Sequence, residues 1–121
     1  MSSKSYRDLI VWQKALDLVD DIYLLSSGFP DKEKFGLTSQ IRGTAISIPS
    51  NIAEGQGRYS TKEFQRFLHI SLGSLAELDT QIEIAFRQKM IDELQKDRVR
   101  DQIVEIRKML FGLINSLKSN S

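Results

Sequence analysis

The chain has 121 residues, a length typical of one domain with its own hydrophobic core. Its 17 lysine and arginine residues are balanced by 16 aspartate and glutamate residues, which excludes a strongly basic domain of the kind that binds nucleic acid through overall charge. The absence of cysteine excludes disulfides, thiol nucleophiles and thiolate metal sites. With no apolar signal segment and no apolar run that could span a bilayer, we expect a cytoplasmic protein without membrane contact.

The first predicted helix, residues 7–26, has two adjacent apolar stripes and is expected to end at a left-handed cap on Gly28. The stripes are Leu9, Trp12, Leu16, Val19 and Tyr23, and Val11, Ala15, Leu18, Ile22 and Leu25. One stripe is enough for the core of a bundle. The second stripe either widens the core-facing arc or packs against other copies of the subunit. We expect oligomer contacts. The spacing leaves open which stripe faces the core, and the residues named for the interface are Val11, Ala15, Leu18 and Ile22.

The second predicted helix, residues 33–54, keeps its apolar spacing through Pro49, and Asp31 is expected to cap it. A proline inside a helix removes one backbone hydrogen bond, at a cost of roughly 3 kcal/mol. We expect Pro49 to bend the helix, and the residues expected to bond the freed carbonyl and to support close helix packing are Ser47, Ser50 and Asn51. The bend would set the direction in which Glu54 and Gly55 leave the bundle. The alternative is a ligand site formed by Ser50, Asn51 and Glu54.

The last two predicted helices begin at capping boxes. Ser60 with Glu63 opens a helix over residues 61–88, and Asp92 with Gln95 opens one over residues 93–118. Both helices continue an apolar seam of helical period, and no segment alternates as a strand does. The sequence therefore predicts an all-α fold: a single-domain, up-and-down antiparallel four-helix bundle that is oligomeric.

One row of basic residues is a candidate nucleic-acid contact. Arg58, Lys62 and Arg66 recur every four residues and would neutralise two or three phosphates, while Tyr59 and His69 lie near enough to stack on unpaired bases. The alternative is an ordinary solvated helix face. The basic residues of the fourth helix alternate with carboxylates at spacings that favour pairs within the helix.

The sequence lacks the residue patterns of a catalytic or metal site. The single histidine, His69, is expected on a polar helix face, and the acidic residues Glu77, Asp79 and Glu83 lack the Glu-x-x-His partners of a di-iron bundle. No phosphate-binding loop occurs. We therefore predict a protein that is not an enzyme, with no catalytic residue, no metal and no cofactor.

Three segments resemble the 23S rRNA-intervening-sequence proteins. They are YRDLIVWQKALDLVDDIY, FGLTSQIRGTAISIPSNIAEG and STKEFQRFL. The resemblance implies a compact four-helix bundle that assembles as a ring-shaped homopentamer. It extends to the accessory variability protein of diversity-generating retroelements, which works with a reverse transcriptase and nucleic acid. It does not imply catalysis.

Two classes of function follow from these observations. The first is a non-catalytic oligomeric adaptor that presents basic helix faces to RNA, DNA or a nucleoprotein. The second is a protein-interaction scaffold without a nucleic-acid role. A third, narrower reading is an accessory subunit for a retroelement reverse transcriptase.

Overall fold

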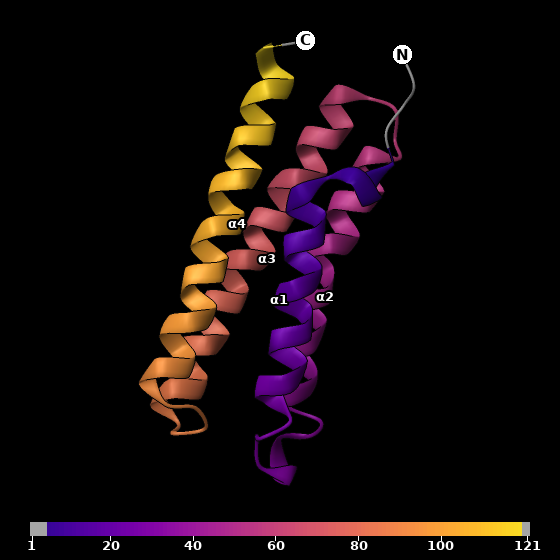
Figure 1. Cartoon of the computed structure of the whole chain (residues 1–121). Helices are drawn as coiled ribbons and strands as arrows, with labels where there is room; N and C mark the ends of the chain where they lie inside the picture. Colours follow the sequence, from indigo (N-terminus) through magenta and orange to yellow (C-terminus); the bar gives the residue numbers. More distant parts are fainter. Residues whose placement is uncertain (1–4, 120–121) are drawn as a thin grey trace.

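The structure, a computed structural model, describes residues 5–119 and contains four long helices (Figure 1). Its elements are a 3-10 turn η1 (Tyr6–Asp8), α1 (Ile10–Ser26), a second 3-10 turn η2 (Asp31–Glu33), α2 (Leu37–Gln56), α3 (Thr61–Arg87) and α4 (Glu93–Ser119). Neighbouring helices run in opposite directions, so the α2–α3 turn lies at one end of the bundle and the other two turns lie at the opposite end. The predicted all-α four-helix bundle is confirmed.

Local hydrogen bonds fix where α3 and α4 begin. The hydroxyl of Ser60 accepts from the Glu63 backbone N–H at 3.2 Å, and the Asp92 and Gln95 side chains each accept from the other residue's backbone N–H at 2.8–2.9 Å. The predicted cap at Asp31 is wrong. The backbone of Asp31 opens η2 instead, and Glu33 accepts from the Leu37 N–H at the start of α2.

A non-glycine residue closes the α3–α4 turn. Lys89 has a φ of 62°, and the Met90 N–H donates to the Ala85 carbonyl at 2.9 Å, as in a left-handed helix cap. Tyr59, in the α2–α3 turn, is the other non-glycine residue with a positive φ in the described chain, and none of its described glycines has one. The predicted left-handed cap at Gly28 is therefore wrong.

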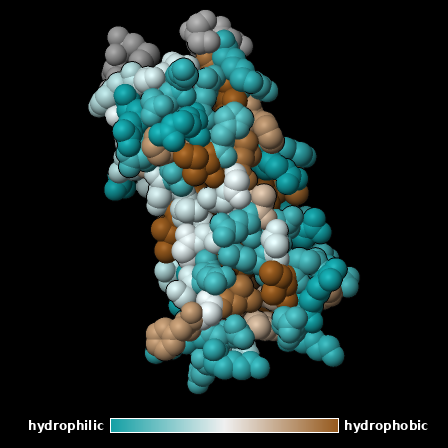
Figure 2. Space-filling view, turned by 180° about the vertical axis from the view of Figure 1, so that it is seen from behind, coloured by the Kyte–Doolittle hydropathy of each residue, from teal (hydrophilic) through white to brown (hydrophobic). Residues whose placement is uncertain are grey.

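The four helices enclose one apolar core. Its fully buried large side chains come from every helix: Leu18, Ile22, Ile41, Ile48, Ile52, Leu68, Leu75, Leu78, Ile82, Ile103, Ile106 and Leu110. Burying each such side chain contributes about 1.5–3 kcal/mol relative to leaving it in water. Seen from behind, the hydrophobic surface is broken into separate spots among hydrophilic and near-neutral residues (Figure 2).

Helix α2 runs without interruption through Pro49, whose side chain is buried. Ser47, Ser50 and Asn51 donate to the carbonyls of Thr44, Ile46 and Ser47, not to the Ala45 carbonyl that Pro49 leaves without its usual donor. The prediction that they bond the freed carbonyl is therefore wrong. These short side chains instead hold α2 as a continuous helix at the proline.

Small residues bring α2 and α3 into close contact, as the sequence predicted for this segment. The hydroxyl of Ser47 lies 2.7 Å from that of Ser74, and the Ser71 hydroxyl donates to the Ile48 carbonyl at 3.0 Å. Gly55 is buried beneath Phe67 on α3. The small residues around Pro49 thus serve helix packing.

Helix α1 is tied to α2 by Arg42. Its guanidinium donates to the Ser26 hydroxyl at 2.7 Å and to the Tyr23 carbonyl at 3.3 Å, and lies 4.5 Å from the centre of the Tyr23 ring. A cation at the Tyr23 carbonyl, in the last turn of α1, also complements the negative end of the α1 dipole. No local pattern marks Arg42 for this role, because its partners precede it by 16 and 19 residues.

Candidate functional site

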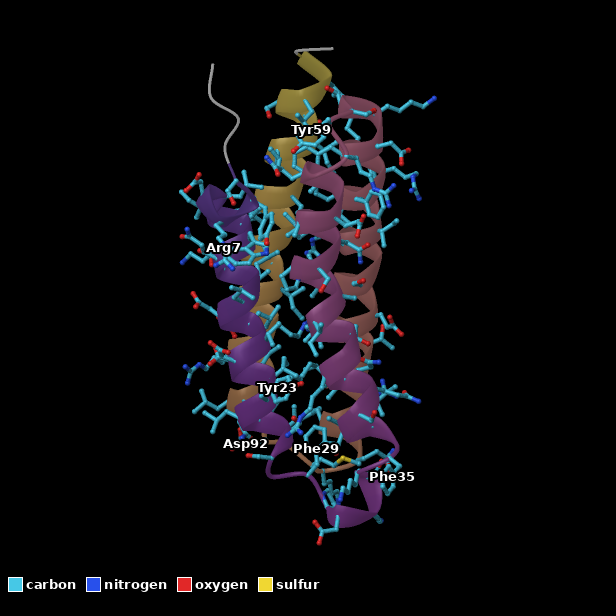
Figure 3. The ribbon with its side chains drawn as sticks, turned by 90° about the vertical axis from the view of Figure 1, so that its right-hand side faces the viewer. Arg7, Tyr23, Phe29, Phe35, Tyr59 and Asp92 are labelled. Atoms are coloured by element: carbon cyan, nitrogen blue, oxygen red, sulfur yellow. The ribbon has the colours of Figure 1, made fainter. Side chains whose placement is uncertain are left out.

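An apolar groove lies between α1 and α2, on the face seen in Figure 3. It has a volume of about 280 Å³ and is lined by Tyr6, Trp12, Leu16, Val19, Ile46, Pro49, Ser50 and Ala53. Leu16 and Ile46 expose 37% and 41% of their surface. The bundle core is complete beneath them, so the groove is a hydrophobic surface without a partner in this subunit.

Aromatic residues form one end of this groove. The rings of Tyr6 and Trp12 meet edge to face with centres 5.2 Å apart, and the Arg7 guanidinium lies 5.9 Å and 5.6 Å from the two ring centres. The turn η1 holds Tyr6 in this position, and the Gln13 side chain donates to the Arg7 carbonyl at 2.8 Å. Tyr23 lies on the same side of the bundle as Arg7 but nearer its other end, and Arg42 from α2 stacks on the Tyr23 ring.

The four residues predicted to form the oligomer interface lie in the core instead. Val11, Ala15, Leu18 and Ile22 expose only 0–4% of their surface. Another copy cannot reach them in the folded subunit, so this assignment is wrong. The other stripe, which contains Trp12 and Leu16, faces the groove. The inward stripe is the one that packs on α2 and α4. The spacing of apolar residues within α1 does not distinguish the two stripes.

The predicted basic row is brought together around one aromatic ring. Arg58 lies in the α2–α3 turn and Arg66 on α3, and their guanidinium groups are 5.1 Å and 4.6 Å from the centre of the Phe67 ring. Lys62 is exposed on the first turn of α3. The three predicted cations therefore share one end of the bundle.

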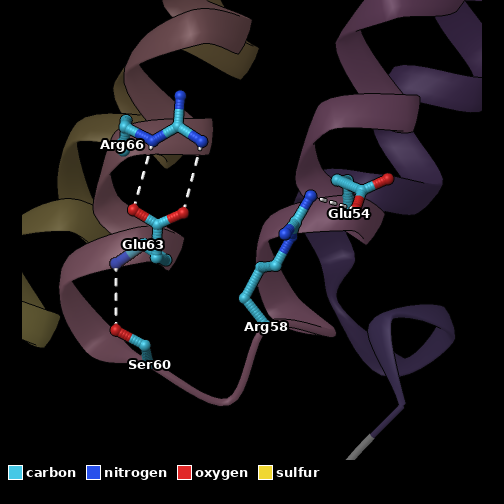
Figure 4. A network of polar contacts seen from close by, with 5 residues as sticks. All are labelled: Glu54, Arg58, Ser60, Glu63 and Arg66. Carbon is cyan, nitrogen blue, oxygen red and sulfur yellow. Dashed lines mark hydrogen bonds and ion pairs between the residues drawn. The ribbon is translucent and has the colours of Figure 1, made fainter.

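Two carboxylates oppose these cations (Figure 4). Arg58 pairs with Glu54 at 2.9 Å, and Arg66 donates twice to Glu63 at 3.2 Å. The hydrogen bond from Arg66 lowers the pKa of Glu63, and the same bond raises the pKa of Arg66. Glu63 is therefore ionised throughout the neutral range. The basic cluster, defined as Arg58, Lys62 and Arg66, has only modest excess positive charge.

Tyr59 projects from the turn beside the basic cluster. Its side chain is 91% exposed and its φ is 57°, an uncommon conformation for a bulky residue. His69 is exposed on α3. Both rings are exposed, as stacking on bases would require, and the strained backbone at Tyr59 marks the turn as a candidate contact point.

The alternative ligand site around Pro49 is not assembled. Ser50 and Asn51 donate to backbone carbonyls of α2, and Glu54 pairs with Arg58. The charges of α4 also differ from prediction. They pair with other helices, Arg100 with Asp79 at 3.1 Å and Glu105 with Lys14 at 3.8 Å.

Among the described residues, no three His, Asp or Glu side chains lie close enough together to hold a metal ion. No helix in that part of the chain combines the length and the apolar character that a bilayer crossing requires.

The model of the 23S rRNA-intervening sequence protein family matches residues 7–112. The chain belongs to this family. The match spans all of α1, α2 and α3 and most of α4, so it includes the basic cluster and every lining residue of the groove except Tyr6. The resemblance stated from the sequence is thereby confirmed.

A solved structure supports the same conclusion. The chain is similar to a protein of unknown function from the S23 ribosomal protein family of Bacteroides thetaiotaomicron, with 27% sequence identity and a TM-score of 0.80. The similarity covers 87% of this chain and 98% of the other. The comparison with curated proteins finds no match. Family membership therefore gives the fold, while the function rests on the surfaces described above.

Proposed function

We propose that this family member is a non-catalytic adaptor that works as an oligomer and binds a second copy through the α1–α2 groove. The observation that carries the proposal is an aromatic-lined apolar groove on the outside of a subunit whose core is already filled. Contiguous apolar surface of this kind on a soluble domain marks an interaction site. Its role would be to assemble into an oligomer and to present binding surfaces to a partner. This role requires no covalent bond to be made or broken.

The residue types in and beside the groove suit a protein interface. Tryptophan, tyrosine and arginine are the residues most enriched among those that dominate binding energy. Here Tyr6, Arg7 and Trp12 stand together at one end, and Tyr23 with Arg42 lies towards the other. Their rings and guanidinium groups are already ordered by contacts within the subunit, which reduces the entropy lost on association.

A closed ring is the assembly that we favour, with the five subunits that the family resemblance implies. A ring other than a dimer uses two different faces of each subunit, because each copy binds its neighbour head to tail. The α1–α2 groove would provide one of these faces. Several basic clusters would then lie on one particle, so weak contacts from each would combine.

Nucleic acid is the partner that we propose for the basic cluster. Lys62 has no ion-pair partner among the described residues, and Tyr59 offers an exposed ring beside it. Because Glu54 and Glu63 offset the two arginines, each subunit would bind weakly and without strong sequence preference. Binding would become useful only when an oligomer repeats the cluster. A scaffold without nucleic acid is the alternative outcome of the binding test.

The assembly proposal is tested by light scattering on the purified chain and on Leu16→Glu. We expect a homo-oligomer for the wild type and a smaller species for the variant, because a buried carboxylate at an interface has no partner. Leu94→Glu, the same change at an exposed position of α4, should leave the mass unchanged. A monomeric wild type, or equal effects of the two substitutions, would refute the proposal.

A further inference from the structure

A separate hollow opens between α1 and α4. It measures about 140 Å³, and its walls include Leu24, Leu25 and Val99 together with Asp21, Arg98 and Gln102. A cavity of roughly 150 Å³ holds a molecule as large as benzene. The hollow is therefore large enough for a compact organic molecule. It is too small for a segment of another protein or for a nucleotide. It lies on a different pair of helices from the groove and does not depend on the proposed function.

The amide of Gln102 is only half satisfied. Its nitrogen donates to the Asp21 carboxylate at 2.8 Å, while its oxygen is buried without a hydrogen-bond partner in the described chain. A buried acceptor without a donor is costly. Rotation about the last side-chain torsion of glutamine is broad, so a small turn would bring this oxygen to a donor in the hollow.

Charges of opposite sign border the same hollow without pairing. Arg100 and Glu105, on the same helix, form ion pairs with other helices. Asp21 and Arg98 have no ion-pair partner among residues 5–118, and both line the hollow. The hollow thus has a carboxylate and a guanidinium beside an apolar wall, and a turn of the Gln102 amide would add an amide oxygen. That set of groups is complementary to a molecule that has a cation, an anion and a hydrocarbon part.

We propose that this hollow binds a free α-amino acid with a small apolar side chain. The ammonium group would donate to the Asp21 carboxylate and to the Gln102 oxygen, and the carboxylate would accept from the Arg98 guanidinium. The side chain would pack on Leu24, Leu25 and Val99. Hydrogen bonds to charged partners are stronger than neutral ones, so the two charged contacts would contribute most of the affinity for a small ligand.

The charge pattern distinguishes this ligand from simpler ones. An amine without a carboxylate would leave Arg98 unused, and a carboxylic acid without an ammonium would meet the Asp21 charge. The zwitterion satisfies both groups at once. Binding would also link α1 to α4, so the ligand should stabilise the folded bundle in proportion to its occupancy.

The experiment is heteronuclear NMR titration of the full chain with L-valine, propylamine and propionate up to about 10 mM, a range that detects millimolar dissociation constants. We expect saturable shift changes with L-valine at the backbone amides around Asp21 and Gln102. The two half-ligands should bind at least tenfold more weakly. Shifts that map outside this hollow, or equal responses to all three compounds, would overturn the proposal.

Substitutions at the charged residues of the hollow provide a second test of the proposal. Asp21→Asn and Arg98→Gln should each weaken L-valine binding about tenfold or more, since each removes one charged partner. The matched changes Asp20→Asn and Arg107→Gln, at exposed positions of the same two helices, should not alter it. Equal effects of target and control substitutions would show that bulk charge is responsible and that the hollow is not a site. Absence of L-valine binding to the wild type would refute it directly.

Discussion

Gly55 and Phe67 are in such close contact that a methyl group added at Gly55 would lie 2.5 Å from the Phe67 Cβ. A Cβ is fixed to its backbone, so Phe67 can give way only if α3 moves away from α2. The same Phe67 ring lies beneath Arg58 and Arg66. The Gly55–Phe67 contact thus sets the helix separation at the end of the bundle that carries the basic cluster.

Gly55→Ala is therefore expected to lower the free energy of unfolding by about 1–3 kcal/mol, the usual cost of overpacking. The control is Gly43→Ala, where the added methyl would meet nothing within 4 Å. That change should raise stability by about 0.5–1 kcal/mol, because alanine favours a helix interior over glycine. Urea denaturation at one fixed protein concentration measures both. Stabilisation of similar size in both variants would contradict the steric argument.

Gln81→Met is expected to stabilise the bundle by about 1 kcal/mol. Gln81 is 7% exposed, and its amide oxygen is buried without a hydrogen-bond partner in the described chain. Methionine has a similar shape and places no polar atom there. Urea denaturation again provides the measurement, with Gln65→Met, at a less buried position of α3, as the control. A loss of stability would show that the Gln81 oxygen is satisfied in solution.

Trp12→Ala is expected to weaken association of subunits by at least about 2 kcal/mol, or roughly 30-fold in the dissociation constant, if Trp12 anchors the interface. Sedimentation velocity over a dilution series gives this constant. Helix content by circular dichroism should be unchanged, since Trp12 lies at the edge of the core. Ile10→Ala, an exposed residue of α1, is the control. An unaltered dissociation constant for Trp12→Ala would exclude the groove as the contact face.

Replacing Lys62 and Arg66 together by glutamate should weaken nucleic-acid binding and reduce its salt dependence. Each phosphate neutralised by a protein cation contributes about −0.9 to the log–log slope on a duplex. The control is the double change Lys32→Glu and Lys34→Glu, which alters charge equally at the opposite end of the bundle. Fluorescence anisotropy at several salt concentrations gives both slopes. Equal losses would indicate diffuse charge rather than the basic cluster.

Glu63→Gln should have the opposite effect and strengthen nucleic-acid binding at neutral pH, because Arg66 no longer faces a carboxylate.

The lowered pKa of Glu63 also gives a stability prediction. A depressed folded-state pKa stabilises the protein above the unfolded-state value, and that contribution is lost as the pH falls through the folded value. The stability difference between wild type and variant should therefore disappear in acid. A difference independent of pH would contradict this origin.

The sequence by itself determined the helices and most of their ends, because those signals are local. Asp92 and Gln95 complete a capping box within a single turn, so no distant residue is needed to predict the start of α4. The apolar period likewise marked Leu68, Leu75 and Ile82 as one face of α3, and all three are buried. The placement of Lys62 and Arg66 in the first turns of α3 also followed from this local signal, whereas Arg58 lies in the turn before the helix.

Only the tertiary structure decided which stripe of α1 is core. Val11 and Trp12 belong to stripes with nearly the same spacing, and only the helices packed around α1 distinguish them. Contacts between helices also explain why Arg100 pairs with Asp79 on α3 rather than with a carboxylate of α4. They explain as well why position 55 has room only for glycine, since Phe67 of α3 packs directly against it. Each of these contacts joins residues from different helices, so its energy depends on distances that no local pattern encodes.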